Sequence, residues 1–150
     1  MSVIVRTTTI GASLEDVFAF HLDTRNAAAI APRGTTVLRV DGSFPVEQGA
    51  RVRLVVRQRP LPWVQRWLVE IEVVEAPTTL VDRMIEGPFA RWRHERRFLA
   101  VAGGVEMTER LDYALPLGPL GRLVDHLVVR HLIGRTFTER QRLTRELLER

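Results

Sequence analysis

The stretch from residue 90 to 99, Ala-Arg-Trp-Arg-His-Glu-Arg-Arg-Phe-Leu, alternates between two kinds of side chain. Trp92, His94, Arg96 and Phe98 fall on one face of an extended strand, and charged residues fall on the other. A strand that needed only a core contact would carry Val, Ile or Leu at positions 94 and 96. An apolar inner face with a few fixed polar groups is typical of a ligand cavity.

A second alternating stretch, residues 105 to 115, follows a turn at Ala102-Gly103-Gly104. If Val101 lies opposite Gly104, the inward partners are Arg96 with Glu109, His94 with Leu111, and Trp92 with Tyr113. We therefore expect an inward Arg96–Glu109 ion pair. The pair has two interpretations, a structural pair inside a wide barrel or part of a site, because buried pairs contribute little net stability.

The chemistry available to this inner face is acid–base chemistry, with His94, Glu109, Tyr113 and Arg96 as candidate catalytic residues. The four histidines show no metal-ligand spacing with carboxylates, and there is no glycine-rich phosphate loop and no Gly-x-Ser-x-Gly elbow. We expect no metal and no organic cofactor.

Composition predicts one ordinary globular domain over residues 1–150, with 45% hydrophobic and 27% charged residues. There is no cysteine, no apolar stretch long enough to cross a membrane and no visible signal peptide, so we expect a cytoplasmic protein without an integral membrane segment. All 22 basic residues are arginines, and they are interleaved with 18 acids. The high isoelectric point thus reflects missing lysines, and nucleic-acid binding is not expected.

The elements that position the inner face read as strands, two short helices, more strands and a long helix. Ser13 is a candidate N-cap for a helix to Leu22, and a second short helix fits residues 25–31. Strands are expected near residues 3–10, 36–40, 46–50, 51–59, 67–73 and 80–86, with Val52, Leu54, Val56, Trp67, Val69, Ile71 and Val73 inward. Which side of residues 80–86 faces inward stays open: Asp82, Met84 and Glu86, or Val81, Arg83 and Ile85. A bulge would resolve it.

The C-terminal helix is expected from Arg122 to Leu148, after the breaker-rich joint at residues 115–121. Its apolar stripe faces one direction up to about Leu132 and changes direction after Gly134, which indicates either a kink near that residue or a helix that contacts different surfaces along its length.

Residues 82–140 carry a family resemblance. They contain an acid before Gly87-Pro88-Phe89, a Trp-x-His-x-Arg-x-Phe strand, the joint Tyr-Ala-Leu-Pro-Leu-Gly-Pro-Leu-Gly at 113–121, and a helix with Phe137 and Arg140. This pattern resembles the polyketide cyclase/dehydrase-like branch of the START-like, or SRPBCC, superfamily. Arg96 stands where that branch has a second histidine, and Val17-Phe18 replaces a tryptophan that is frequent there.

The resemblance implies an α+β helix-grip fold, in which an antiparallel curved sheet of six or seven strands, two short helices and a long C-terminal helix enclose a cavity. It also implies a small hydrophobic or aromatic ligand in that cavity, and Arg96 suggests an anionic or carbonyl group on it. The predicted lining residues are Trp67, Trp92, His94, Arg96, Phe98, Met107, Glu109, Leu111 and Tyr113, with Leu127 and His131 on the helix side.

Two alternatives to simple ligand binding remain. One is a cyclase or dehydratase that acts on a polyketide-like substrate through His94 or Glu109, with Arg96 or Tyr113 holding an enolate oxygen. The other is an interaction or carrier module that uses the outer arginine face of residues 51–59. A weak homodimer is compatible with each of these.

Overall fold

The computed structural model describes residues 1–150 as a curved sheet with helical segments before and after it. The strands are β1 Ser2–Ile10, β2 Thr35–Asp41, β3 Arg51–Gln58, β4 Val64–Glu75, β5 Thr79–Glu86, β6 Arg91–Val101 and β7 Gly104–Ala114. The helical segments are α1 Leu14–Leu22, the 3-10 turn η1 Thr24–Ala27, α2 Gly118–Val124, the π-helical turn η2 Asp125–Val129 and α3 Arg130–Leu148.

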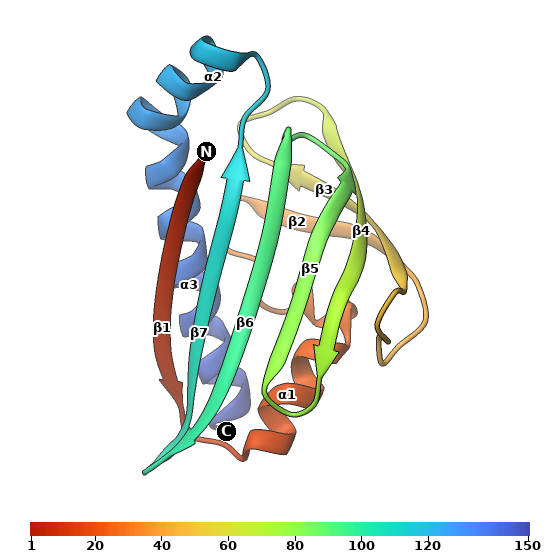
Figure 1. Cartoon of the computed structure of the whole chain (residues 1–150), viewed down its shortest axis with the longest axis vertical. Helices are drawn as coiled ribbons and strands as arrows, with labels where there is room; N and C mark the ends of the chain where they lie inside the picture. The colour runs from red at the N-terminus through yellow and green to blue at the C-terminus, as the bar shows by residue number, and fades with distance from the viewer.

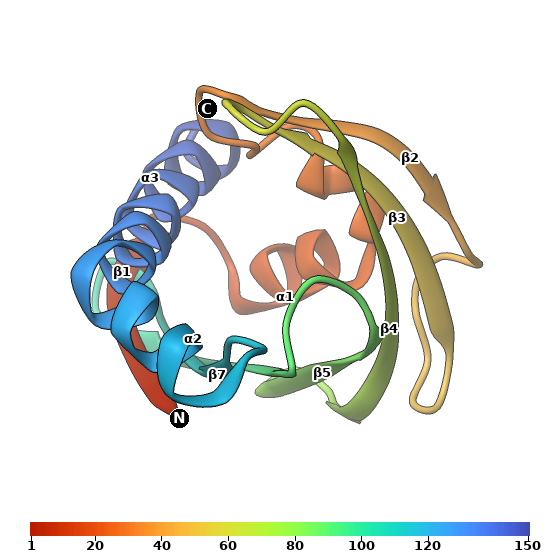
Figure 2. The same ribbon diagram turned by 90° about the horizontal axis from the view of Figure 1, so that it is seen from above.

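All seven strands form one antiparallel sheet in the order β1-β7-β6-β5-β4-β3-β2. The sheet curls around α1, and α3 packs along β1 at one edge (Figure 1 and Figure 2). This is the α+β helix-grip architecture expected from the sequence. Residues 46–50, expected as a strand, form a connecting loop instead.

The β6–β7 pairing follows the register predicted from the glycine turn. Val101 lies opposite Gly104, and the pairs Arg96–Glu109, His94–Leu111 and Trp92–Tyr113 are all present. Gly104 is needed at this turn because its φ of +146° suits glycine and a Cβ there would come within 2.0 Å of the Ile10 carbonyl oxygen.

A bulge in β4 settles which face of β5 points inward. The β4–β5 register shifts between Ile71 and Val73, and Asp82 lies opposite both Ile71 and His94. Asp82 therefore shares the inner face with His94, as in the first of the two alternatives. The prediction of an inward Val73 is wrong, because the bulge turns Val74 toward the core instead.

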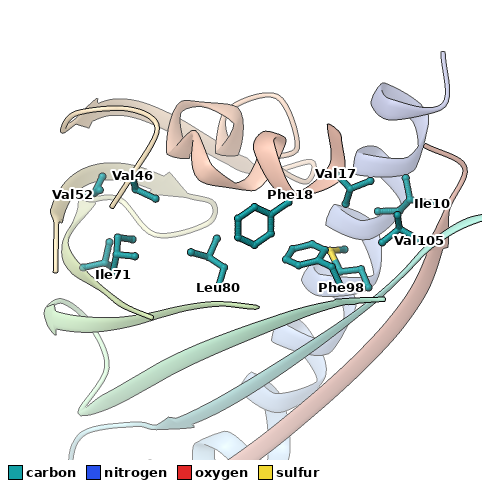
Figure 3. Close-up of a cluster of buried hydrophobic side chains, with 11 residues drawn as sticks. Ile10, Val17, Phe18, Val46, Val52, Ile71, Leu80, Phe98 and Val105 are labelled. Atoms are coloured by element: carbon teal, nitrogen blue, oxygen red, sulfur yellow. The ribbon is translucent and has the colours of Figure 1, made fainter. Parts of the chain in front are cut away.

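The larger apolar core lies between α1 and the sheet. Ser13 caps α1, since its hydroxyl accepts a hydrogen bond from the Asp16 backbone N–H at 3.1 Å. This cap directs Val17 and Phe18 toward the sheet, where the Phe18 ring meets the Phe98 ring edge to face at 5.5 Å. Figure 3 shows these side chains together with Ile71, Leu80 and Val105. The cluster fixes the end of β6 that precedes the β6–β7 turn.

The irregular turn of the C-terminal helix lies before Gly134, where a kink was one of the two expectations. The π-helical turn η2 interrupts it at residues 125–129, whereas Gly134 lies within the regular helix α3. Gly134 instead allows close packing on β1, because a Cβ there would lie 2.5 Å from Arg6 Nη2. None of the helices is long and apolar enough to cross a membrane.

Candidate functional site

A belt of polar side chains separates two apolar clusters inside the curved sheet. The larger cluster includes Phe98 and Met107, and the smaller one comprises Ile4, Leu111, Tyr113, Ile133 and Phe137. Between them along β6 and β7 lie His94, Arg96 and Glu109, of which His94 and Glu109 are buried. Polar groups in such a position need partners, and the partners define the site.

The first part of the belt joins His94 to Glu109. His94 Nε2 lies 2.6 Å from Glu109 Oε2, and Gln141 Nε2 on α3 donates to Glu109 Oε1 at 3.1 Å. Burial alone would raise the pKa of Glu109. The hydrogen bond with His94 and the charge of His94, helped by the charges of Arg140 and Arg96, outweigh burial and hold this pKa well below its usual range. Glu109 is therefore an ionised carboxylate in the interior.

The second part joins Arg96 to Asp82 on β5. Arg96 Nη2 donates to Asp82 Oδ2, so the expected Arg96–Glu109 ion pair does not form although the two residues are cross-strand neighbours. The expectation is wrong because Asp82, whose orientation was open, offers Arg96 a carboxylate on its other side. The Nε–H of Arg96 is buried and has no acceptor. This is a buried guanidinium donor that the protein leaves unused.

Arg140 on α3 brings a second cation to the belt. Its guanidinium carbon lies over the Phe137 ring, 5.7 Å from the ring centre. Burial is the main cause that lowers the pKa of Arg140, Arg96 lowers it further, and Glu109 and Asp82 oppose the shift. Its guanidinium forms no ion pair in the structure. Arg96 and Arg140 together give the interior a cationic spot with free donors.

His21 completes the belt from the side of α1. Its Nδ1 donates to the Val17 carbonyl oxygen at 2.8 Å, and its ring lies 5.1 Å from the Phe98 ring. Burial, followed by the charge of Arg96, lowers the pKa of His21 to about 4. His21 is thus a neutral, packed histidine at physiological pH.

Aromatic side chains adjoin the belt at the end where β5 meets β6. Trp92 lies 5.0 Å from Trp67 and 4.7 Å from Phe89, measured between ring centres. All three rings are partly exposed, whereas Tyr113 and Phe137 behind them are buried. The rings of Trp67, Phe89 and Trp92, which we call the aromatic approach, thus lie between the polar belt and the surface.

The Tyr113 hydroxyl finds its partner within the protein. It donates to Asp125 Oδ1 at 2.5 Å, and Ser2 donates to the other oxygen of the same carboxylate. Burial and then this hydrogen bond raise the pKa of Tyr113 far above its usual range. The hydroxyl thus fastens η2 to the sheet, and its role in orienting a ligand stays a prediction.

The predicted helix-side residues Leu127 and His131 are exposed and do not reach the interior. The inward positions of this part of the helix are taken by Asp125 and Ile133. Trp67 and Trp92 belong to the aromatic approach, while Phe98, Met107 and Leu111 are core residues.

Two surface hollows lie away from the belt. An open groove of about 760 Å³ runs between β1 and α3, and a smaller one of about 290 Å³ lies over β2, β3 and β4 beside Trp67. Among the side chains predicted to line an internal cavity, the Trp67 and Trp92 rings lie 5.0 Å apart between their centres, and the His94 ring lies 5.0 Å from the ring of Phe137. No cluster of three or more His and acidic residues has the arrangement of a metal site.

The outer arginine face of β3 is partly neutralised. Arg51 lies 3.5 Å from Glu70, which also pairs with Arg83 on β5 at 3.1 Å. Exposed ion pairs of this kind are common on protein surfaces and contribute little to stability. The arginine face therefore has no feature that marks it as a binding surface.

Sequence reasoning missed the importance of Gln141, Asp125 and Arg140. Gln141 and Phe137 have a usable signal, since a spacing of four places them on one face of α3. Asp125 has none, because a charged residue gives no apolar signal for an inward position.

Comparison with known proteins supports the fold. No protein-family model and no curated protein matches the sequence. The chain is similar to TTHA0849 from Thermus thermophilus, with a TM-score of 0.76 and 22% identity over 97% of this chain and 95% of that one. It is also similar to a START superfamily protein from Mycobacterium smegmatis, with a TM-score of 0.71 and 13% identity over 98% and 97%.

A third similar structure is the di-domain ARO/CYC BexL from the BE-7585A biosynthetic pathway. Its TM-score is 0.80 at 16% identity, over 99% of this chain and 50% of that one. These likenesses confirm the START-like, polyketide cyclase-like fold that the sequence resembles. At such identities they establish the fold alone.

Proposed function

We propose that the protein binds a small, largely apolar or aromatic molecule that carries an anionic or carbonyl oxygen, between the curved sheet and α3. The observation that carries this proposal is the buried Arg96 Nε–H, which has no acceptor within the protein. A buried donor without a partner costs about 1–3 kcal/mol, more when charged, so its retention calls for an acceptor from outside. Arg140, which forms no ion pair, would supply further donors to the same oxygen.

The apolar part of the ligand would lie among Trp67, Phe89 and Trp92. The side chains of Phe89 and Trp92 are both partly exposed. They can therefore turn to admit a flat molecule, while the hydrogen bonds of His94, Glu109 and Asp82 keep the polar belt fixed. This combination of adaptable rings and fixed polar groups is that of a small-molecule site.

A fluorescence titration with 2-naphthoate, against 2-naphthylmethanol as the uncharged analogue, tests the proposal. We expect 2-naphthoate to quench tryptophan emission saturably and to bind at least about tenfold more tightly than the alcohol. Arg96→Met and Arg140→Met should each remove this preference. Arg97→Met is the matched control, because Arg97 is the next residue on β6 but points outward and pairs with Glu95.

The Arg140 variant guards against a folding artefact, since its removal leaves no ion-pair partner behind. Equal affinity of the wild type and the two interior variants for 2-naphthoate would contradict the proposal.

Catalysis is the second candidate function, and the His94–Glu109 contact favours it. In the tautomer in which His94 donates Nε2–H to Glu109, the ring carries its lone pair on Nδ1, as in other carboxylate-oriented histidine bases. Nδ1 would then remove a proton next to a ligand carbonyl, and Arg96 would hold the resulting enolate oxygen. This is the first step that a cyclase or dehydratase of polyketide-like substrates requires.

Proton exchange measures that step without the natural substrate. An aromatic β-ketoester incubated in D₂O should exchange its α-proton faster with the wild type than with Glu109→Gln. Arg97→Met should leave the rate unchanged. Identical exchange in the wild type and Glu109→Gln would remove the catalytic candidate while leaving binding untouched.

A further inference from the structure

The helical segment from residue 117 to 132 presents an unusual amount of apolar surface to solvent. The exposed large apolar side chains here, which we call the outer helix face, are Leu117, Leu120, Leu123, Val124, Leu127, Val128 and Leu132. Elsewhere in the chain such side chains are scattered. Contiguous exposed apolar surface of this kind marks an interaction site.

The exposed apolar residues of this face follow a regular helical spacing. The inward positions are Gly121, Asp125 and Ile133, with the partly buried Val129 completing a repeat of four. The outward apolar residues recur at i, i+3, i+4, i+7 and i+8 from Leu120 to Val128. The segment therefore has an apolar face that points away from the body of the protein and into solvent. Figure 1 shows it at the end of the molecule, beside the N-terminus.

The charges that border the outer helix face are of one sign. From Ala114 to Thr138 the only acid is Asp125, which is buried and bonded to Ser2 and Tyr113. The exposed ionisable residues of the segment are Arg122, His126, Arg130, His131 and Arg135. A partner for this surface must accept apolar side chains and cations together.

The groove of about 760 Å³ extends the same surface toward β1. Arg130, His131 and Arg135 line its helix side together with Glu139, whose carboxylate pairs with Arg142, and Val3, Val5 and Arg6 of the edge strand β1 line the other side. Val3 and Val5 are also exposed, at 42% and 49%. The groove thus offers cationic donors next to apolar side chains, immediately beside the outer helix face.

We propose that the outer helix face docks the protein on an anionic lipid bilayer. The leucines and valines would enter the boundary between headgroups and acyl chains, and Arg122, Arg130 and Arg135 would contact lipid phosphates. A second copy is a poorer occupant, because a two-fold interface would bring these arginines against one another without an exposed acid to pair with them. The segment would lie along the bilayer surface, so the association would be peripheral and reversible.

Sedimentation with lipid vesicles tests the docking surface. The full chain should bind vesicles of phosphatidylglycerol and phosphatidylcholine and bind pure phosphatidylcholine at least about tenfold more weakly. Binding should fall as salt rises and the screening length shortens from about 30 Å at 0.01 M to about 8 Å at 0.15 M. Equal binding to both vesicle types, or none to either, would overturn the proposal.

Two exposed leucines provide a matched pair of variants. Leu127→Ser, at a side chain 63% exposed on the outer helix face, should weaken vesicle binding about tenfold. Leu99→Ser, at a side chain 61% exposed near the β6–β7 turn at the other end of the sheet, should leave it unchanged (Figure 1). Arg130→Glu should abolish the preference for anionic lipid.

Light scattering of the same proteins measures their molar mass in solution and so tests whether the outer helix face binds a second copy of the chain. A dimer that Leu127→Ser dissociates, with no vesicle binding by the wild type, would assign the face to a second copy and overturn the lipid proposal. Because Leu127 and Arg130 are exposed, the variants should keep the wild-type thermal unfolding midpoint, which confirms that each one tests the surface.

Discussion

Glu109 lies directly opposite Arg96 in the β6–β7 register, yet its carboxylate bonds to His94 Nε2 at 2.6 Å. The two inward polar residues of β6 therefore lean in opposite directions, His94 toward β7 and Arg96 toward Asp82 on β5. This divergence satisfies both carboxylates and leaves the Arg96 Nε–H without an acceptor. The proposed ligand contact arises from this arrangement.

Replacing Asp82 by Asn tests the importance of the Arg96 pairing for stability. The change removes the ion-pair partner of Arg96, whose side chain is 12% exposed, and should lower the free energy of unfolding by about 3 kcal/mol. Glu70→Gln, which weakens the exposed contacts to Arg51 and Arg83, should cost less than about 1 kcal/mol. Urea unfolding measures both, and equal losses would show that the Asp82 pair behaves as a surface pair.

His21 should make the stability depend on pH between 6.5 and about 4. In this window the unfolded chain takes up a proton at His21 and the folded protein does not. Acidification therefore favours unfolding, by up to about 3 kcal/mol over the window. Glu109 adds a further loss only as the pH falls below 4.5, because its folded pKa lies lower still. Urea unfolding from pH 7 to 4 should give a clearly smaller pH dependence for His21→Leu, and an unchanged slope would contradict the neutral, buried state of His21.

The β6–β7 hairpin could be predicted residue by residue because its information is local. The glycine turn fixes the register, and period-two alternation then assigns the faces of Trp92, His94, Glu109 and Tyr113. The side-chain partners could not be predicted in the same way. The partner of Arg96 depends on a bulge in β4, which lies two strands away from β6 in the sheet and is unmarked in the sequence.

The helix side of the site was predicted less well for a physical reason. The apolar side chains that recur from Leu123 to Leu132 face away from the sheet, so a prediction from apolar spacing placed Leu127 and His131 on the inner face, whereas both are exposed. The regular spacing in α3 does identify Phe137 and Gln141 as inward. Their inward direction follows when the helical spacing is counted within α3, without extending it from the joint at residues 115–121.

Tyr113→Phe tests the attachment of the π-helical turn to the sheet. The change removes the donor to Asp125 Oδ1 and leaves Ser2 as the remaining hydroxyl partner of that buried carboxylate. We expect a loss of about 1–3 kcal/mol, concentrated in faster amide hydrogen exchange across residues 118–132. Uniform acceleration across the sheet, without a local effect at 118–132, would show that the hydroxyl has no specific role in fastening η2.

Two adjacent glycines in the β6–β7 turn give a matched test of the register. Gly104→Ala would place a Cβ 2.0 Å from the Ile10 carbonyl oxygen and should destabilise the protein severely. Gly103→Ala meets no atom within 4 Å, so only its φ of +87° is unfavourable and the cost should be about 1 kcal/mol. Thermal unfolding compares the two, and similar midpoints would indicate a different packing of the turn against β1.

Native mass spectrometry of the protein purified from its own host tests the ligand-binding proposal most directly. We predict an excess mass, absent after denaturation, that belongs to an aromatic or otherwise apolar molecule with an acidic or carbonyl group. The same preparation of Arg96→Met should lack this mass, and Arg97→Met should retain it. An excess mass that persists in Arg96→Met, or its absence from the wild type under conditions that preserve the fold, would contradict a ligand held by the Arg96 guanidinium.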